Sequence, residues 1–337
     1  MLHRVLFENE VLFGNAFLQS IPHPSGFLGE ILKDLSIFCH FAGGITFFVF
    51  LLPFVYLCYS RLFGVQIALA ALSTGIINGT MKIFGESARP LFISPEVEDL
   101  RKIANETSYG FPSGHAHVSV LIWGILFLQF KNIYFRTFAM FMILFTPFSR
   151  MYMGVHYPGD VIGGAFTGIL SLFLIRLLFK KYPEFPNLSI IKEVDKRQKI
   201  ARSISLALVA ITLPATLLIR GEMTEQEFSS ISQVTASAAS FAGLFSGILY
   251  LKYIFGENYY DWGIAKNLPD FFVRLLAILL GIGVLYFGLG TIEKNFLKDE
   301  FLFRYIRYFI LNLYLVLGVP LFLKKRFQGR FLSRTSE

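Results

Sequence analysis

Cysteine and charge are both scarce in this sequence. Two cysteines, Cys39 and Cys58, occur in 337 residues, too few for a disulfide framework or a thiolate metal site. A spanning helix between them would hold them about 28 Å apart at about 1.5 Å per residue, so we expect no bridge. Charged residues form 16% of the chain, whereas soluble domains average about 25%. This scarcity excludes an ordinary soluble protein.

Apolar residues are correspondingly abundant. They form 54% of the chain, Phe occurs 39 times, and the mean hydropathy is +0.58. The net charge of +8 forms no stripe on a soluble module, which argues against nucleic acid as a partner. We assign the positive charge to membrane topology and to contacts with anionic lipid headgroups. The composition therefore predicts an integral membrane protein.

Long apolar stretches suggest how the chain crosses the bilayer, which takes about 20 residues per helix. We expect an all-α, polytopic membrane helical bundle of about nine spans. The predicted spans are residues 42–60, 64–82, 115–131, 135–151, 159–179, 201–219, 234–254, 270–290 and 304–323. Glu8 and Glu10 interrupt the N-terminus where a secretory signal needs an unbroken apolar core, so we interpret it as an interfacial segment.

A charged linker divides the chain. We predict an N-terminal interfacial segment and core at 1–180, a cytoplasmic linker at 181–200, a four-span C-terminal region at 201–323 and a basic cytoplasmic tail at 324–337. Most of the 31 Lys and Arg fall on the face that carries the linker and the tail. That face is therefore predicted to be cytoplasmic, and the opposite face periplasmic or lumenal, in a bacterial inner membrane or an organelle membrane.

Polar residues recur at the ends of four predicted spans. Lys82 ends the second span, His115 begins the third, Arg150 ends the fourth and Asp160 begins the fifth. Independent hydropathy assignments thus bring KIFGESARP, FPSGH and SRMYMGVHYPGD to one membrane face. An ionisable residue beside a span costs free energy unless it has a partner or a function. We therefore expect a functional site here.

Three of these residues are permanent cations. Lys82, Arg89 and Arg150 offer many donors, and the planar fork of Arg suits bidentate contact with phosphate oxygens. Ser113 and Gly114 precede a span whose first amides are unpaired and whose dipole favours an anion. The pattern predicts a phosphate-binding pocket.

Histidines supply the acid and base. Asp160, four residues after His156, could hold one ring nitrogen while the other attacks phosphorus, and His115 could protonate the leaving oxygen. The cations would stabilise the transferring phosphoryl group, and no metal or other cofactor is required. A zinc site from His115, His117, His156 and Asp160 is an alternative that the adjacent cations argue against. His117 points elsewhere on a helix and is expected to pack.

The combined spacing resembles the three-part signature of the type-2 phosphatidic acid phosphatase superfamily. The signature residues are Lys82, Arg89, Pro90, Pro112, Ser113, Gly114, His115, Ser149, Arg150, His156 and Asp160. The resemblance implies a metal-independent membrane phosphatase with a phosphohistidine intermediate, inhibited by vanadate. The implied roles are nucleophile for His156, its partner for Asp160, general acid for His115, and phosphate binding for Lys82, Arg89, Ser113, Gly114 and Arg150.

The number and order of the predicted spans resemble particular branches of this superfamily. The signature begins at the end of the second long span, and four spans follow the linker. This layout is similar to the nine-span sphingosine-1-phosphate phosphatase and glucose-6-phosphatase branches rather than to six-span bacterial members. It implies that the N-terminus and the site face the lumen.

Several functions fit this site. We expect hydrolysis of a lipid phosphomonoester or pyrophosphate in the extracytoplasmic leaflet, and the sequence does not select the lipid. The alternatives are transfer of a phosphoryl or headgroup to an acceptor other than water, a water-soluble sugar phosphate as substrate, and a lipid transporter or flippase whose site only binds. The four C-terminal spans have no role in this mechanism, so they are compatible with a transporter. They could also form a homodimer interface.

Overall fold

The computed structural model describes residues 7–91, 93–217, 222–256, 265, 267–297 and 300–324. Every regular element in these residues is a helix, which confirms the predicted all-α fold. The predicted interfacial segment contains two short helices, α2 (Glu10–Phe13) and α3 (Asn15–Ser20). Apart from Lys324, the predicted basic tail lies outside the described residues.

The remaining elements follow in chain order. They are α4 Phe27–Gly43, α5 Ile45–Phe54, η1 Val55–Tyr59, α6 Arg61–Gly85, α7 Pro95–Ala104, α8 Gly114–Val118, η2 Ser119–Trp123, α9 Gly124–Gln129, α10 Ile133–Tyr152, α11 Pro158–Lys181, α12 Val194–Thr212, η3 Leu213–Leu217, α13 Glu225–Tyr250, η4 Leu251–Phe255, α15 Leu268–Gly281, η5 Ile282–Gly288, α16 Leu289–Phe296, α17 Phe301–Leu313 and η6 Tyr314–Gly318. η3 is a 3₁₀ turn, and the other η elements are π-helical stretches that continue an α-helix.

Six helices in the described residues are long and apolar enough to cross a membrane, and a bent pair, Phe27–Gly43 with Thr46–Tyr59, makes seven if it is one span. The six are Arg61–Gly85, Pro158–Lys181, Val194–Leu217, Glu225–Tyr253, Leu268–Phe296 and Phe301–Lys324. The protein is thus an integral membrane protein, but nine spans are not confirmed. The apolar helix Gly114–Gln129 is shorter than these six, and α10 is not among them.

The chain folds into two compact units. Unit 1 comprises residues 1–48, 73–177 and 220–234, and unit 2 comprises 49–72, 178–219 and 235–337. The predicted linker at 181–200 falls within unit 2, and its role as a domain boundary stays a prediction. All the predicted site residues belong to unit 1.

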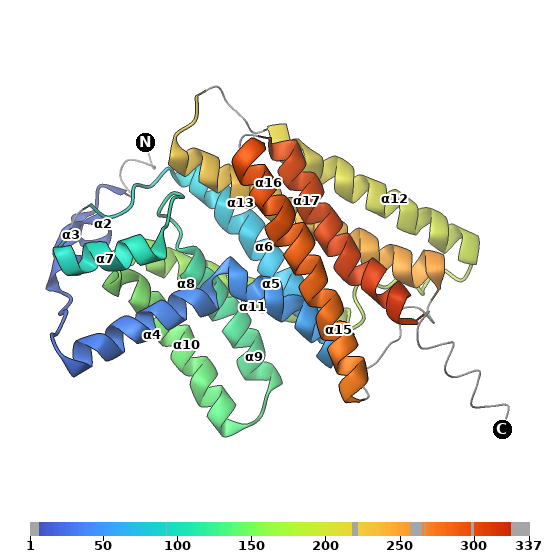
Figure 1. Cartoon of the computed structure of the whole chain (residues 1–337), viewed down its shortest axis with the longest axis horizontal. Helices are drawn as coiled ribbons and strands as arrows, with labels where there is room; N and C mark the ends of the chain where they lie inside the picture. The colour runs from blue at the N-terminus through green and yellow to red at the C-terminus, as the bar shows by residue number, and fades with distance from the viewer. Residues whose placement is uncertain are drawn as a thin grey trace. The chain divides into compact units, whose positions relative to one another are not determined.

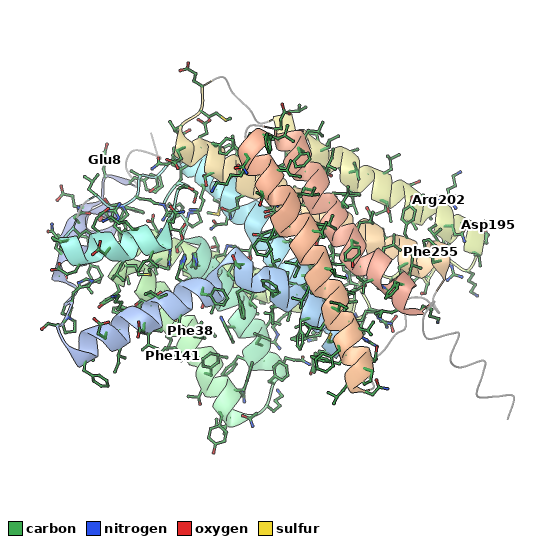
Figure 2. The ribbon with its side chains drawn as sticks, viewed as in Figure 1. Glu8, Phe38, Phe141, Asp195, Arg202 and Phe255 are labelled. Atoms are coloured by element: carbon green, nitrogen blue, oxygen red, sulfur yellow. The ribbon has the colours of Figure 1, made fainter. Side chains whose placement is uncertain are left out.

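Aromatic packing joins α4 to α10 in unit 1. The two helices cross in Figure 1, and Figure 2 labels Phe38 on α4 and Phe141 on α10. The ring centroids of Phe38 and Phe138 lie 6.4 Å apart, within the range of favourable aromatic pairs. This packing holds Arg150, in the last turn of α10, beside α4.

Small residues let α11 approach α8 closely. A Cβ on Gly164 would lie 2.4 Å from the carbonyl oxygen of Ser113, so a larger residue would push the helices apart. The backbone amide of Ser113 donates to the carbonyl of Asp160 at 2.9 Å. The start of α11 and the start of α8 are therefore fixed to each other.

Unit 2 contains buried ionic pairs. Its helices α15, η5 and α16 run antiparallel to α17 and η6 (Figure 1). Arg274 donates to both carboxylate oxygens of Asp270, at 2.9 and 2.8 Å, and to the carbonyl of Leu57 at 2.5 Å. Glu293 pairs with Arg304 and Arg307. These contacts are the helix-packing pairs expected of polar residues in apolar surroundings.

Candidate active site

Residues far apart in the chain meet in one buried cluster of unit 1. Lys82 comes from the end of α6, His115 from the start of α8, Arg150 from the end of α10 and Asp160 from the start of α11. Arg89 and His156 lie in the connecting loops. The three predicted segments are thus brought together.

His156 and Asp160 form a hydrogen-bonded pair. Nδ1 of His156 lies 3.2 Å from Oδ2 of Asp160, and the same oxygen accepts from the backbone amide of Tyr157 at 2.9 Å. Both side chains are almost wholly buried, with His156 1% and Asp160 0% exposed. The four-residue spacing puts the carboxylate in the first turn of α11, just behind the imidazole. The ring orientation is therefore fixed.

The other ring nitrogen of His156 faces Arg89. A terminal guanidinium nitrogen lies 3.3 Å from Nε2, and because a guanidinium can only donate, Nε2 is the acceptor. The proton of the neutral ring is then on Nδ1, toward Asp160. Burial, and next the charges of Arg89, Lys82 and Arg150, hold the pKa of His156 well below its usual value. Nε2 thus carries a free electron pair at neutral pH.

Backbone carbonyls hold the cations in position. Arg89 donates from Nε to the carbonyl of Ser108 at 2.6 Å and from a terminal nitrogen to the carbonyl of Val155 at 2.8 Å. Lys82 donates to the carbonyls of Tyr109 and Gly110. The loop before α8 is thereby tied to the cations.

A carboxylate that we did not predict as a site residue lies among these cations. Glu106 accepts from Arg89 at 3.0 Å through Oε2 and from Arg150 at 2.6 Å through Oε1. Burial raises the pKa of Glu106, but the charges of Arg89 and Arg150 outweigh burial and bring this pKa far below its usual value. Glu106 is therefore an anion in the pocket. In the sequence it is only one of several acidic residues in a long loop.

His115 faces the same carboxylate. Its Nε2 donates to the carbonyl oxygen of His40 at 3.1 Å, since a carbonyl can only accept. Nδ1 is then the ring nitrogen that faces the pocket, 3.4 Å from Oε1 of Glu106. The ring of His115 stacks on that of His40 with centroids 5.1 Å apart. Sequence reasoning missed His40, because it lies outside the three segments and no spacing marks it.

Ser113 and Gly114 form the helix start beside the cluster. The Ser113 side chain caps α8 by accepting from the amide of Ala116 at 3.5 Å. Asn78 donates to the carbonyl of Pro112 at 3.0 Å, and a Cβ on Gly114 would lie 3.2 Å from the Asn78 oxygen. This turn is thus closely packed against α6. Phosphate binding by Ser113 and Gly114 stays a prediction.

His117 lies outside the cluster. Its Nε2 is 3.1 Å from the hydroxyl of Ser171 and its side chain is buried, as expected for a packing residue. The zinc alternative that included it is therefore not assembled as predicted. His40, Glu106 and His115 do bring ligand atoms within 4.8 Å of one another. Arg150 already contacts both Glu106 and Nδ1 of His40, and this charge disfavours a cation there.

Comparison with known proteins identifies the domain that carries the cluster. Residues 63–184 match the family described as the PAP2 superfamily. The chain is 26% identical over 152 residues to phosphatidylglycerophosphatase B of Bacillus subtilis, which covers 40% of this chain and 71% of that protein. It is 29% identical over 130 residues to lipid A 4'-phosphatase of Bacteroides thetaiotaomicron, covering 38% of this chain and 56% of the relative.

A third relative has a different kind of name. The bacitracin transport permease protein BcrC of Bacillus licheniformis is 30% identical over 118 residues, covering 34% of this chain and 55% of that protein. The chain thus spans little more than half the length of two of the three relatives. No solved structure matches it. The resemblance read from the signature is confirmed, whereas the nine-span layout is not, and residues 63–184 of this chain form a domain of the PAP2 superfamily.

Proposed function

We propose that this protein hydrolyses a phosphomonoester or pyrophosphate on a lipid, through a phosphohistidine formed on His156. One observation carries the proposal. The electron pair on Nε2 of His156 lies in a buried cluster of cations, while Nδ1 is held by Asp160. This is the arrangement of an activated nucleophile and its orienting group. Relatives named as phosphatases of lipid phosphates support it.

In the first step, Nε2 of His156 attacks phosphorus. The bond from phosphorus to the leaving oxygen breaks, and the electron pair stays on that oxygen. His115 takes up a proton on Nδ1 when the phosphate dianion binds beside it, and donates that proton to the leaving oxygen. Lys82, Arg89 and Arg150 stabilise the charge on the equatorial oxygens. Asp160 accepts a hydrogen bond from Nδ1–H of His156 and balances the positive charge that develops on the ring.

In the second step, water attacks the phosphorus of the phosphohistidine. His115, now neutral at Nδ1, takes a proton from this water while the bond between phosphorus and Nε2 breaks. Inorganic phosphate leaves, and the ring of His156 regains its electron pair. Each catalytic group returns to its starting state.

An apolar groove beside the cluster favours a lipid over a sugar phosphate. It has a volume of about 360 Å³ and lies between α6 and α11. Its lining residues are Ile77, Met81, Phe111, Gly163, Phe166, Thr167, Leu170, Ser171 and Leu174. Phe111 directly precedes Pro112 and Ser113, so one lining residue of the groove adjoins the predicted phosphate-binding turn. A hydrocarbon chain fits such a lining, and a sugar does not.

The distribution of Lys and Arg predicts on which side of the membrane the reaction occurs. We propose that the cluster faces the periplasm or a lumen, because Lys and Arg are more frequent on the opposite face of the predicted topology. Reporter fusions to the C-terminus test this directly. A C-terminus outside the cytoplasm contradicts it.

Two other activities share the same pocket. A transferase would pass the phosphoryl group from His156 to an alcohol instead of water, and a transporter would bind lipid phosphate without a covalent step. The name of the relative BcrC and the helices of unit 2, which have no part in the reaction above, favour testing transport. Pure binding needs neither a nucleophile nor an acid.

The experiment is phosphate release by the purified protein from a panel of lipid phosphates and pyrophosphates. We expect release by the parent and by His117→Asn, a buried histidine outside the cluster, and none by His156→Ala. Transfer of the phosphoryl group to an added alcohol indicates the transferase. Translocation of labelled lipid in vesicles without release indicates the transporter. Full activity of His156→Ala contradicts the proposal.

A further inference from the structure

The groups proposed to bind phosphate are already occupied by a side chain of the protein itself. Glu106 Oε2 lies 3.0 Å from Arg89, and Oε1 lies 2.6 Å from Arg150 and 3.4 Å from Nδ1 of His115. The two carboxylate oxygens therefore make the contacts that two oxygens of a phosphate would make. This overlap concerns the same site as the proposed function and rests on it.

A phosphate dianion and the Glu106 carboxylate cannot both occupy this position. Like charges about 4 Å apart repel, and burial strengthens the repulsion because it removes the screening by water. The charges of Arg89 and Arg150 keep Glu106 ionised, so protonation at neutral pH does not relieve it. One of the two anions must leave.

Glu106 is the group that is able to leave. Its side chain is 18% exposed, whereas those of Arg150 and Arg89 are 0% and 9% exposed. It lies in the loop after α7, next to Asn105, which caps the helix in a left-handed conformation, φ 45°. The next residue, Thr107, is held by a 2.8 Å hydrogen bond to Ser229. A rotation of the Glu106 side chain toward solvent therefore needs no movement of the loop.

We infer that Glu106 is a resident counter-anion that holds Arg89, Arg150 and His115 in place in the free enzyme and is exchanged for the substrate's phosphate. The exchange swaps one anion for another, so the buried arginines are never left without a partner. It also weakens the binding of every phosphate by the free energy of the contacts that Glu106 must give up. Glu106 returns to the arginines when inorganic phosphate leaves, and thereby assists product release. It is a positioning residue and does not touch the reacting atoms.

The exchange predicts that removing the charge of Glu106 tightens anion binding. In the purified full chain, we expect Glu106→Gln to lower the inhibition constants of orthovanadate and inorganic phosphate by about tenfold, the size of a one-unit electrostatic interaction. KM for a water-soluble phosphomonoester falls as well, and kcat falls if phosphate release becomes limiting. Glu98→Gln is the matched control, because Glu98 pairs with Arg101 on α7 outside the cluster and should leave all constants unchanged.

Weaker or unchanged inhibition by vanadate and phosphate in Glu106→Gln overturns the inference. Glu106→Asp serves if the Gln variant is misfolded. Its shorter carboxylate cannot hold both arginines, so we expect a smaller tightening, and unchanged constants count against the exchange. Thermal stabilisation by vanadate and by phosphate, with no substrate present, gives a second measure of affinity. If the parent binds these anions but releases no phosphate from any phosphoester, the proposed function fails while the exchange is still tested.

Discussion

Arg150 donates from a terminal nitrogen to Nδ1 of His40 across 3.0 Å. The backbone carbonyl of His40 accepts a hydrogen bond from Nε2 of His115. One residue of α4 therefore orients both a proposed phosphate-binding cation and the proposed acid. α4 precedes residues 63–184, so this support comes from outside the matched domain.

Replacing His40 should therefore lower activity without touching the reacting groups. His40→Phe keeps a ring that can stack on His115 but removes the acceptor for Arg150. We expect kcat/KM to fall about 10- to 100-fold, because a displaced binding group misaligns the substrate. His40→Asn, whose side-chain oxygen can replace Nδ1, should retain most activity. Full activity of His40→Phe in phosphate-release assays contradicts the positioning role.

Asp160→Asn tests the partner of the nucleophile. The amide cannot balance the charge on the His156 ring and can stabilise the wrong tautomer, so kcat should fall on the order of 10²- to 10⁴-fold. Asp99→Asn is the control, because Asp99 is exposed on α7 and pairs with the exposed Lys102. Steady-state kinetics of both variants give the comparison, and a loss of less than twofold in Asp160→Asn would count against its role.

The pH profile reports the protonation of His156. Protonation of Nε2 blocks attack, so activity disappears as pH falls through the pKa of this ring. Because burial and the neighbouring cations lower that pKa, the acid limb assigned to His156 should lie below about pH 6.5, the usual imidazole value.

A substrate phosphate also titrates near pH 6, so the comparison must use one substrate throughout. Arg89→Gln removes the strongest of the charges that lower the pKa of His156. The acid limb of kcat/KM should then move to higher pH, in addition to the general loss from weaker phosphate binding. A limb that stays in place, or moves to lower pH, is the contrary result.

A bulky side chain introduced into the apolar groove tests whether the groove binds the lipid tail. Thr167→Phe adds a ring inside the groove, and Ile169→Phe adds the same ring on α11 outside it. We expect Thr167→Phe to raise KM for a long-chain lipid phosphate severalfold and to leave a short, water-soluble phosphomonoester unaffected, whereas Ile169→Phe changes neither. Each lost methylene contact is worth up to about 0.8 kcal/mol, so the effect should grow with chain length. Equal effects on both substrates would mean that the tail lies elsewhere.

Local spacing explains why much of the cluster could be predicted. His156 and Asp160 are four residues apart at the start of a helix, which fixes their contact from sequence alone. Lys82 and His115 stand at the ends of apolar stretches, and those ends meet in the structure.

Long-range contacts explain what could not be predicted. Glu106 and His40 contact Arg150 across 44 and 110 residues, and neither lies at a distinctive spacing from it. The span count is unconfirmed for a related reason. Apolar length identifies a helix but not whether it crosses the bilayer, and Gly114–Gln129 is apolar yet short.

The most direct test is to trap the covalent intermediate. The parent protein is mixed with a substrate labelled with ³²P in the scissile phosphate, quenched in alkali, which preserves phosphohistidine, and digested for peptide mapping. We predict label on the peptide that contains His156, its loss in His156→Ala, and its accumulation in a His115 variant supplied with a substrate whose leaving group needs no acid. Turnover of the same substrate with no label on His156 in any of these proteins contradicts the account.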